Sequence, residues 1–284
     1  MKLLTLNTHS LIEENSEQKL QWFVEGILRE RPDLIALQEV NQTARGEEAP
    51  PSLLEGQIPI SDCVKVRRDN YAARVASCLR QAGIPTAWAW LPIKRGFEIY
   101  DEGVAILSLN RKIAAIDRFP ISRDTDYRNW RTRAVLGVQP EGRKDWFYSV
   151  HMGWWGDEPE GFAEQWQMLT ERIAEKRAKG PVWLLGDFNA PASVSGESYD
   201  KIRESGWFDT YESAQEKDDG ITVVGTIDGW RGKTNREAGM RLDYIWCSQK
   251  KEILTSKVVF NGKREPVISD HFGVMIEWKE DADD

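Results

Sequence analysis

Apolar and polar residues follow a strand–helix–strand order at the start of the chain. Residues 2–7 form an apolar run that ends at Asn7, as expected of a buried strand. Apolar residues then recur with helical spacing until Pro32, which stops a helix, and a second apolar run at 34–39 ends at Glu39. Each predicted strand therefore has a polar side chain at its end.

The same order recurs near the middle of the chain. A strand pattern at 146–150 ends at His151, a helical pattern spans 160–178, and the apolar run 182–185 leads to Asp187. We interpret this as an internal duplication that gives two similar halves. If the halves pack sheet on sheet with helices outside, all four strand ends meet at one edge, where a functional site is expected.

The corner Gly186-Asp187-Phe188-Asn189 is a candidate for chemistry. Period-two geometry places Asp187 and Asn189 on one side, while Phe188 points the other way into packing. A carboxylate and an amide at a strand end can hold a metal, a water or a phosphate oxygen. The alternative is an ordinary turn, since Gly-Asp and Asn-Ala-Pro are common turn sequences.

The remaining pattern predicts a helix that begins after Asp69, a turn at 94–96 and several loops. Long loops are expected at 42–68 and 122–131, and the segment 191–240 is expected to be rich in loops with short helical or strand pieces. Further strands are expected at 86–91, 104–109, 112–119, 133–138, 241–246, 253–260 and 272–278. No linker divides the chain, so we expect a single domain over residues 1–284.

Composition narrows the class of protein. With 284 residues, 40% of them hydrophobic and 30% charged, the chain resembles an ordinary soluble globular protein. A net charge of −8 disfavours a protein that binds along nucleic acid, but it allows a small phosphorylated substrate. Three cysteines without CxxC spacing fit a reducing compartment. Polar residues interrupt the N-terminus too early for a signal peptide, so we expect a cytoplasmic protein without a membrane segment.

Acidic residues interrupt apolar strand patterns at several positions, and a buried carboxylate is costly unless it is paired or binds a cation. These acids are Glu39, Glu102, Asp187, Asp243 and Asp270. Glu39 and Asp270 are candidate ligands for Mg²⁺, which prefers oxygen, and Asn7 can complete the shell. Asp243 and Glu102 can each orient a histidine.

The chain has only three histidines. A lone histidine is more often structural than functional. His151 and His271 both occur next to predicted strand ends, and we predict a function for both. His9 follows Asn7 by two residues, and we expect it to be supporting or incidental.

Several of these residues form motifs in a recognisable order. They are Asn7, Gln38-Glu39, Tyr100-Asp101-Glu102-Gly103, His151, Gly186-Asp187-Phe188-Asn189, Asp243-Tyr244 and Ser269-Asp270-His271. This set extends along the whole chain and resembles the endonuclease/exonuclease/phosphatase superfamily. The resemblance implies an α/β fold, a four-layer α/β/β/α sandwich of two packed mixed sheets with outer helices. It also implies metal-dependent hydrolysis of a phosphate ester, with Mg²⁺ as the expected cofactor and Mn²⁺ as a possible one.

The resemblance also implies roles for individual residues. Glu39 would bind the metal with Asn7 nearby, and Asp270 would reach the metal region. Asp187 would orient or deprotonate the attacking water, and Asn189 would hold that water or a phosphate oxygen.

For the phosphate itself, the resemblance implies two histidines. His271 would contact the scissile phosphate with support from Asp243. His151 would be the second phosphate-facing histidine, paired with Glu102, while Tyr100 would donate a hydrogen bond. The family's phosphate-contacting arginine is matched by Arg131, and Arg133 competes for that role.

Within the superfamily three kinds of function compete. A nuclease would want a basic groove, and exported sphingomyelinase-like phosphodiesterases carry signal peptides. A non-catalytic binding protein would have no reason to keep costly buried carboxylates. We therefore expect a cytoplasmic phosphomonoesterase with a small phosphorylated sugar as its substrate, with nucleic acid an improbable partner.

Tryptophans in loops support a sugar substrate. Segments 7–10, 127–133, 151–155 and 227–231 are similar to the bacterial maltose 6'-phosphate phosphatases of this superfamily. In this interpretation Trp130, Trp155 and Trp230 stack on glucosyl rings, since aromatic faces suit such rings. The alternative is that these loops pack as a lid without sugar specificity.

Overall fold

The computed structural model describes residues 1–280 apart from 61–62, 226, 228–229 and 231–238. Its helices and strands follow the predicted alternation of short apolar runs and amphipathic segments. In chain order they are β1 (Lys2–Asn7), η1 (Ser10–Ile12), α1 (Ser16–Glu30), β2 (Leu34–Thr43), α2 (Tyr71–Gln81), β3 (Thr86–Gly96), β4 (Tyr100–Leu109), β5 (Ile113–Pro120), β6 (Ala134–Pro140), β7 (Trp146–His151), α3 (Phe162–Lys179), β8 (Val182–Asp187), α4 (Ser198–Glu204), β9 (Phe208–Asp209), α5 (Thr210–Ser213), β10 (Ala214–Lys217), β11 (Asp243–Cys247), β12 (Ile253–Val259) and β13 (Gly273–Trp278).

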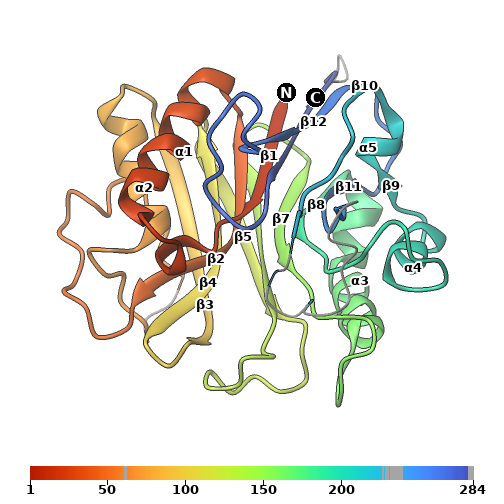
Figure 1. Ribbon diagram of the computed structural model, residues 1–284, viewed down its shortest axis with the longest axis horizontal. Helices are drawn as coiled ribbons and strands as arrows, with labels where there is room; N and C mark the ends of the chain where they lie inside the picture. Colours follow the sequence, from red (N-terminus) through yellow and green to blue (C-terminus); the bar gives the residue numbers. More distant parts are fainter. Residues whose placement is uncertain (61–62, 226, 228–229, 231–238, 281–284) are drawn as a thin grey trace.

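Two mixed sheets pack face to face (Figure 1). One has seven strands in the order β10-β12-β13-β1-β2-β4-β3, and the other has six in the order β5-β6-β7-β8-β11-β9. An apolar cluster that includes Leu3, Ala36, Phe147 and Leu185 fills the space between them. These residues alternate with outward-facing apolar neighbours on the same strands, because both faces of each sheet are covered.

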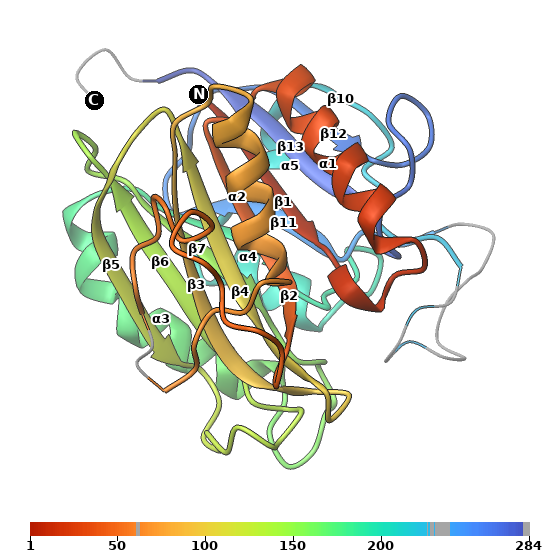
Figure 2. The ribbon, with the colours of Figure 1, turned by 90° about the vertical axis from the view of Figure 1, so that its left-hand side faces the viewer.

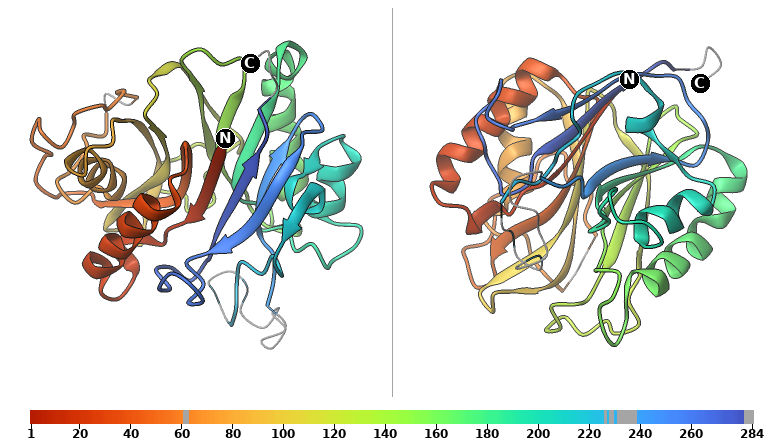
Figure 3. Two further views of the ribbon diagram at one scale, coloured as in Figure 1. Left: turned by 90° about the horizontal axis from the view of Figure 1, so that it is seen from above. Right: turned by 45° about the vertical axis from the view of Figure 1, so that its right-hand side comes forward.

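Helices form the outer layers. On one side α1 and α2 cover the seven-stranded sheet (Figure 2), and Phe23, Ile27 and Ala76 pack against it. On the other side α3 and α4 cover the six-stranded sheet, and the view from above shows the two sheets between these helices (Figure 3). The predicted four-layer sandwich is confirmed. None of the helices in the described part of the chain is both long and apolar enough to cross a bilayer.

The two predicted halves are visible as two parallel strand pairs, each joined by a helix. In the first, β1 pairs with β2 and Asn7 lies opposite Gln38. In the second, β7 pairs with β8 and His151 lies opposite Asp187. Gln38 also joins the sheets, because its Nε2 donates to Ser149 Oγ at 2.9 Å. The four strand ends therefore meet at one edge of the sandwich.

One segment differs from the sequence prediction. The predicted turn at 94–96 is part of β3, which continues to pair with β4 up to the partners Gly96 and Tyr100. The turn lies instead after Gly96, where Phe97 and Glu98 adopt positive φ angles of 46° and 61°. Pairing with β4 decides the length of β3, and such pairing is not visible in local sequence. The short helical or strand pieces expected within 191–240 are α4, β9, α5 and β10.

Candidate active site

A cavity of about 520 Å³ opens at the edge where the four strand ends meet. Its lining includes most of the residues predicted for chemistry. They are Glu39, Glu102, His151, Asp187, Asn189, Asp270 and His271. Residues that are 232 positions apart in sequence, Glu39 and His271, thus share one small volume because the two halves pack sheet on sheet.

Asp187 is one of the carboxylates and histidines that form the floor of the cavity. Its Oδ2 accepts a hydrogen bond from Asn7 Nδ2 at 3.1 Å. The same oxygen lies 3.6 Å from His151 Nε2 and 3.8 Å from His271 Nε2. Burial raises the pKa of Asp187 to about 7, with the His271 charge acting against this shift and Asp243 adding to it. A carboxyl group that titrates near neutral pH is well suited to accept a proton from water.

The pKa values of His151 and His271, two of the three histidines that line the cavity, are shifted in opposite directions. His271 Nδ1 lies 2.9 Å from Asp243 Oδ2, the pairing that the resemblance implied. Although burial acts against it, the carboxylates of Asp243 and Asp187 raise the pKa of His271 well above its ordinary value. Burial lowers the pKa of His151 well below its ordinary value, and nearby cations add to this. His271 is therefore an imidazolium and His151 a neutral imidazole at pH 7.

Asn189 is held by three hydrogen bonds in a left-handed backbone conformation, with φ of 48°. Its N–H donates to Asp187 Oδ1 at 2.9 Å, and its Nδ2 donates to the Met152 carbonyl at 3.0 Å. Its Oδ1 accepts from Trp230 Nε1 at 2.8 Å. Asn189 and Asp187 are thus fixed relative to each other.

Trp230 does not lie where the sequence predicted. It is 8% exposed and belongs to a small apolar cluster with Val223, Ile227 and Leu242. The prediction that it stacks on a sugar ring is wrong for this conformation, because its ring faces protein. It orients the Asn189 side chain instead.

Glu39 is the best placed metal ligand. It lies in a β-bulge, where the register between β2 and β4 shifts, and its φ is 50°. Its Oε1 accepts a hydrogen bond from Asn7 Nδ2 at 2.9 Å. Burial raises the pKa of Glu39, and the charges of Glu102 and Asp270 raise it further. A partly buried carboxylate in a strained backbone conformation beside other carboxylates suits a bound divalent cation, so the residues present fit the implied metal.

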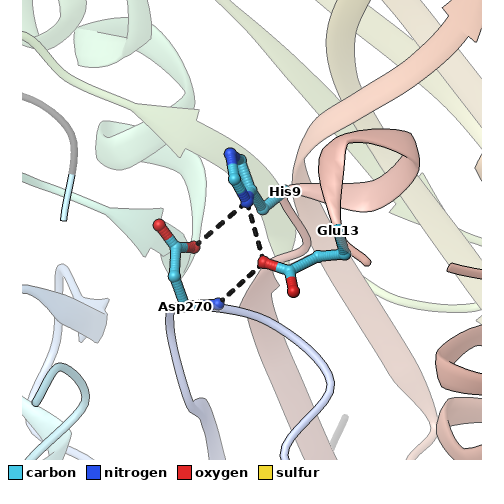
Figure 4. A group of neighbouring side chains, drawn as sticks. All are labelled: His9, Glu13 and Asp270. Carbon is cyan, nitrogen blue, oxygen red and sulfur yellow. Dashed lines mark hydrogen bonds and ion pairs between the residues drawn. The ribbon is translucent and has the colours of Figure 1, made fainter. Parts of the chain in front are cut away.

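His9 contributes more than the sequence suggested. Its Nδ1 lies 2.7 Å from Glu13 Oε1 and 3.9 Å from Asp270 Oδ1 (Figure 4). Although burial opposes it, the carboxylates of Glu13 and Asp270 raise the pKa of His9 to about 9. Glu13 also pairs with Lys19 and accepts from the Asp270 N–H at 3.2 Å. The spacing of four residues between His9 and Glu13 was the signal that sequence reasoning missed.

Two residues of the motif Tyr100-Asp101-Glu102-Gly103 have other partners than expected. Glu102 Oε1 lies 3.1 Å from Lys94 Nζ, so its close partner is this lysine and not His151. Tyr100 is paired in the sheet with Thr43 and is not among the described residues that line the cavity. Lys94 was missed because residues 94–96 were predicted as a turn.

Of the arginines and tryptophans predicted for the substrate site, the structure brings only some to the cavity. Arg133 lines the cavity, whereas Arg131 is turned toward Asp157 and pairs with it at 3.2 Å. Trp130 lines the cavity and is 48% exposed. Trp155 packs toward Phe162, with ring centroids 6.4 Å apart, and its neighbour Trp154 lines the cavity instead. Adjacent residues on a loop point to different sides, and local sequence does not decide which side is inward.

Comparison with known proteins establishes the family. A family model described as "Endonuclease/Exonuclease/phosphatase family" matches residues 4–271. The chain belongs to this family, whose members are typically metal-dependent hydrolases. A search of curated proteins gave no match.

Solved structures agree with this assignment. An endonuclease/exonuclease/phosphatase family protein from Leptotrichia buccalis C-1013-b is 33% identical, with 99% of this chain and 100% of that chain covered and a TM-score of 0.83. A mannosyl-6-phosphatase from Bacteroides thetaiotaomicron VPI-5482 is 18% identical, with 99% and 100% covered and a TM-score of 0.65. Truncated TDP2 from Caenorhabditis elegans is 16% identical, with 98% and 97% covered and a TM-score of 0.62. The last two comparisons show a shared fold.

Proposed function

We propose that this protein is a cytoplasmic, Mg²⁺-dependent phosphomonoesterase that hydrolyses a small phosphorylated sugar such as maltose 6'-phosphate. One observation carries the proposal. In a single cavity, the floor carries carboxylates and histidines, and the wall includes Trp130, whose side chain is half exposed and held in place by its neighbours. The floor suits attack of water on a phosphate, and the wall suits the apolar face of a sugar ring.

On the floor, Asp187 accepts the proton of the attacking water, because its raised pKa makes it a base near neutral pH. His271 is cationic and stabilises the charge on the phosphate oxygens. Asn189 holds the water or a phosphate oxygen at a fixed distance from Asp187. Neutral His151 lies on the other side of Asp187 and can donate or accept a hydrogen bond without adding charge.

Glu39, Asn7 and Asp270 would hold the divalent ion. A bound Mg²⁺ or Mn²⁺ supplies a Lewis acid that neutralises charge on the phosphate. Asn7 connects this region to the base, because its Nδ2 donates to both Glu39 and Asp187. These two hydrogen bonds keep the Glu39 and Asp187 carboxylates at a constant separation.

The Trp130 side chain is half exposed, and its contact with Arg131 holds it in place. The Arg131 guanidinium lies 4.2 Å from its ring centroid. Arg131 is itself held by Asp157 through two contacts of 3.2 and 3.3 Å. The rigid Trp130 ring suits the apolar face of a pyranose. The Asp157 carboxylate beside it, which lines the cavity, suits the hydroxyls of the sugar.

The acidic character of the chain supports a small substrate over nucleic acid, because a net charge of −8 opposes contact with many phosphates. The mannosyl-6-phosphatase with this fold shows that the sandwich accommodates a sugar-phosphate hydrolase. The competing function is a nuclease or phosphodiesterase of the same family.

The test is phosphate release with Mg²⁺ or Mn²⁺ from three substrates: maltose 6'-phosphate, glucose 6-phosphate and DNA with an abasic site. We expect the highest kcat/KM for the disaccharide phosphate, and loss of activity with EDTA. Cleavage of the DNA alone would contradict the sugar interpretation. Hydrolysis of none of the three would favour a binding protein without catalytic activity.

A further inference from the structure

The turn between β3 and β4 places a phenylalanine at the cavity. Phe97 lines the cavity and is 59% exposed, more than any other large apolar residue that the structure describes. Of the nine phenylalanines in the chain, only Phe97 and Phe208 are exposed. A single exposed apolar residue is common on protein surfaces, so exposure alone assigns no role to Phe97.

The backbone of this turn is strained at the same residue. The Ile99 N–H donates to the Gly96 carbonyl at 3.2 Å and closes a two-residue turn. The central residues, Phe97 and Glu98, have φ angles of 46° and 61°. Two positive φ angles are typical of the type I′ turn, which strongly favours Asn-Gly or Asp-Gly, because most side chains are unfavourable there. Strained residues of this kind cluster at ligand sites, and Phe97 combines the strain with a position in the cavity wall.

The turn is fixed against the loop 121–133, which carries Trp130. The Arg95 N–H donates to the Tyr127 carbonyl at 2.6 Å. Tyr127 Oη donates to Asp101 Oδ1 at 3.0 Å, and the same oxygen lies 3.3 Å from the Arg95 guanidinium. The turn and the loop extend from the same end of the sandwich (Figure 1). They therefore form one rigid rim of the cavity.

Phe97 lies away from the floor of the cavity. Lys94 Nζ pairs with Glu102 at 3.1 Å, and Glu102 is close enough to the floor for its charge to raise the pKa of Glu39. Phe97 follows Lys94 by three residues, which span up to about 10 Å of extended chain. The cavity volume of about 520 Å³ falls in the range of roughly 300–1,000 Å³ that suits drug-sized ligands. The Phe97 ring thus suits the part of a substrate that is farther from the phosphate.

We propose that Phe97 stacks on a second, uncharged sugar ring that is joined to the phosphorylated ring of the substrate. Aromatic side chains suit the apolar face of a pyranose, and a ring that the turn already holds in place loses little freedom on binding. Phe97 thereby favours a disaccharide phosphate over a monosaccharide phosphate. This inference rests on the proposed function, because it places the phosphate on the floor, and it adds the residue that distinguishes sugars by length.

The first experiment measures binding of maltose 6'-phosphate and glucose 6-phosphate by isothermal titration calorimetry in EDTA. We expect the wild type to bind the disaccharide phosphate more tightly. Phe97→Asn should bind it about tenfold more weakly than the wild type, because one stacking contact is lost, and should bind glucose 6-phosphate equally well. Phe97→Tyr keeps an aromatic ring and should keep the preference. Failure of the wild type to prefer the disaccharide phosphate, or unchanged binding in Phe97→Asn, would overturn the inference.

Ile99→Asn is the matched control. Ile99 is 57% exposed in the same hairpin, but it is not among the described residues that line the cavity. This variant also replaces an exposed apolar side chain by an amide, and it should bind both sugar phosphates like the wild type. An equal loss in Ile99→Asn and Phe97→Asn would contradict a specific role for the Phe97 ring.

Thermal unfolding without ligand separates sugar binding from a structural role. Asparagine adopts a positive φ more readily than phenylalanine, and Phe97 has little contact surface to lose because it is largely exposed. We therefore expect the Tm of Phe97→Asn to equal or exceed that of the wild type, although its affinity for the disaccharide phosphate falls. A large fall in Tm would show that Phe97 is structural.

The second experiment measures kcat/KM for the same two compounds with Mg²⁺. In Phe97→Asn we expect kcat/KM for maltose 6'-phosphate to fall about tenfold and that for glucose 6-phosphate to stay within about twofold. Equal losses for the two substrates would contradict the inference. If the wild type hydrolyses neither compound but binds the disaccharide phosphate more tightly in EDTA, the proposed function fails and the second sugar subsite stands.

Discussion

The two strand–helix–strand units reach the cavity floor by different backbone arrangements. In the second unit the register is regular, and His151 lies opposite Asp187 at the strand ends. In the first unit the parallel register ends at Asn7 opposite Gln38, and Glu39 lies one residue further on, in a bulge. The bulge turns the Glu39 carboxylate toward the cavity at the cost of a φ of 50°. Related units can thus present different chemistry through a local change in one strand.

The second unit has its own backbone requirement at Gly186. Its φ is 154°, and a Cβ atom there would lie 1.8 Å from the Val150 carbonyl oxygen of the neighbouring strand. In the first unit the unusual backbone conformation is adopted by Glu39, which carries a side chain. In the second unit it is adopted by Gly186, which carries none. The difference matters for function. Glu39 is needed for its carboxylate, whereas Gly186 is needed only because it lets β8 approach β7 closely. Three substitutions test this difference between the two units.

The largest effect is expected from Gly186→Ala. The added methyl group collides with the β7 backbone in an unfavourable φ region, so the strands must separate. We expect a loss of roughly 3 kcal/mol or more in the free energy of unfolding, measured by urea denaturation. Gly196→Ala is the matched control, with a φ of 79° and open space around it. It should lose only about 1–2 kcal/mol. Equal losses would mean that the close approach of β7 and β8 is unimportant.

Asp187→Asn tests the base directly. We expect kcat for the sugar phosphate to fall by roughly 10²–10⁴-fold, because the amide cannot accept the proton of the water. Near pH 7 the variant should be at least as stable as the wild type, because an amide oxygen still accepts from the Asn189 N–H and the buried charge is removed. A large loss of stability instead would show that Asp187 is structural.

The same variant gives a prediction for pH dependence. Burial raises the pKa of Asp187 from 3.8 to about 7, so the folded state binds a proton more tightly than the unfolded state. Its contribution to stability is therefore present below about pH 4 and is lost as the pH rises through about 7. In EDTA, we expect the stability of the wild type to fall relative to Asp187→Asn across this range. A constant difference would contradict the raised pKa.

The smallest change in stability is expected from Glu39→Gln. Because burial and neighbouring carboxylates raise the pKa of Glu39, the neutral amide should stabilise the metal-free protein by about 0.5–2 kcal/mol. The Mg²⁺ concentration for half-maximal activity should rise by at least about tenfold, since a charged ligand is lost. Glu25→Gln, at an exposed position on α1, is the control and should change neither quantity. An unchanged Mg²⁺ requirement in Glu39→Gln would place the metal elsewhere.

The apolar pattern together with the family resemblance predicted the fold class and the floor of the cavity. Strand and helix periods are local properties, so the apolar runs that end at Asn7, Glu39, His151 and Asp187 could be recognised without a structure. The parallel pairing then follows from the strand–helix–strand order, because such connections place strand ends at one edge.

Which side chains form the walls of the cavity depends on the tertiary structure. Whether Arg131 or Arg133 faces the cavity, and whether Trp154 or Trp155 does, depends on how two loops pack against each other. The Trp230 side chain is buried and donates a hydrogen bond to Asn189, although its position in a predicted loop had suggested that it stacks on a sugar ring. Lys94 became part of the site because β3 pairs with β4 beyond the predicted turn. Side chains on loops and strand extensions take their direction from contacts between distant segments, and no local period encodes those contacts.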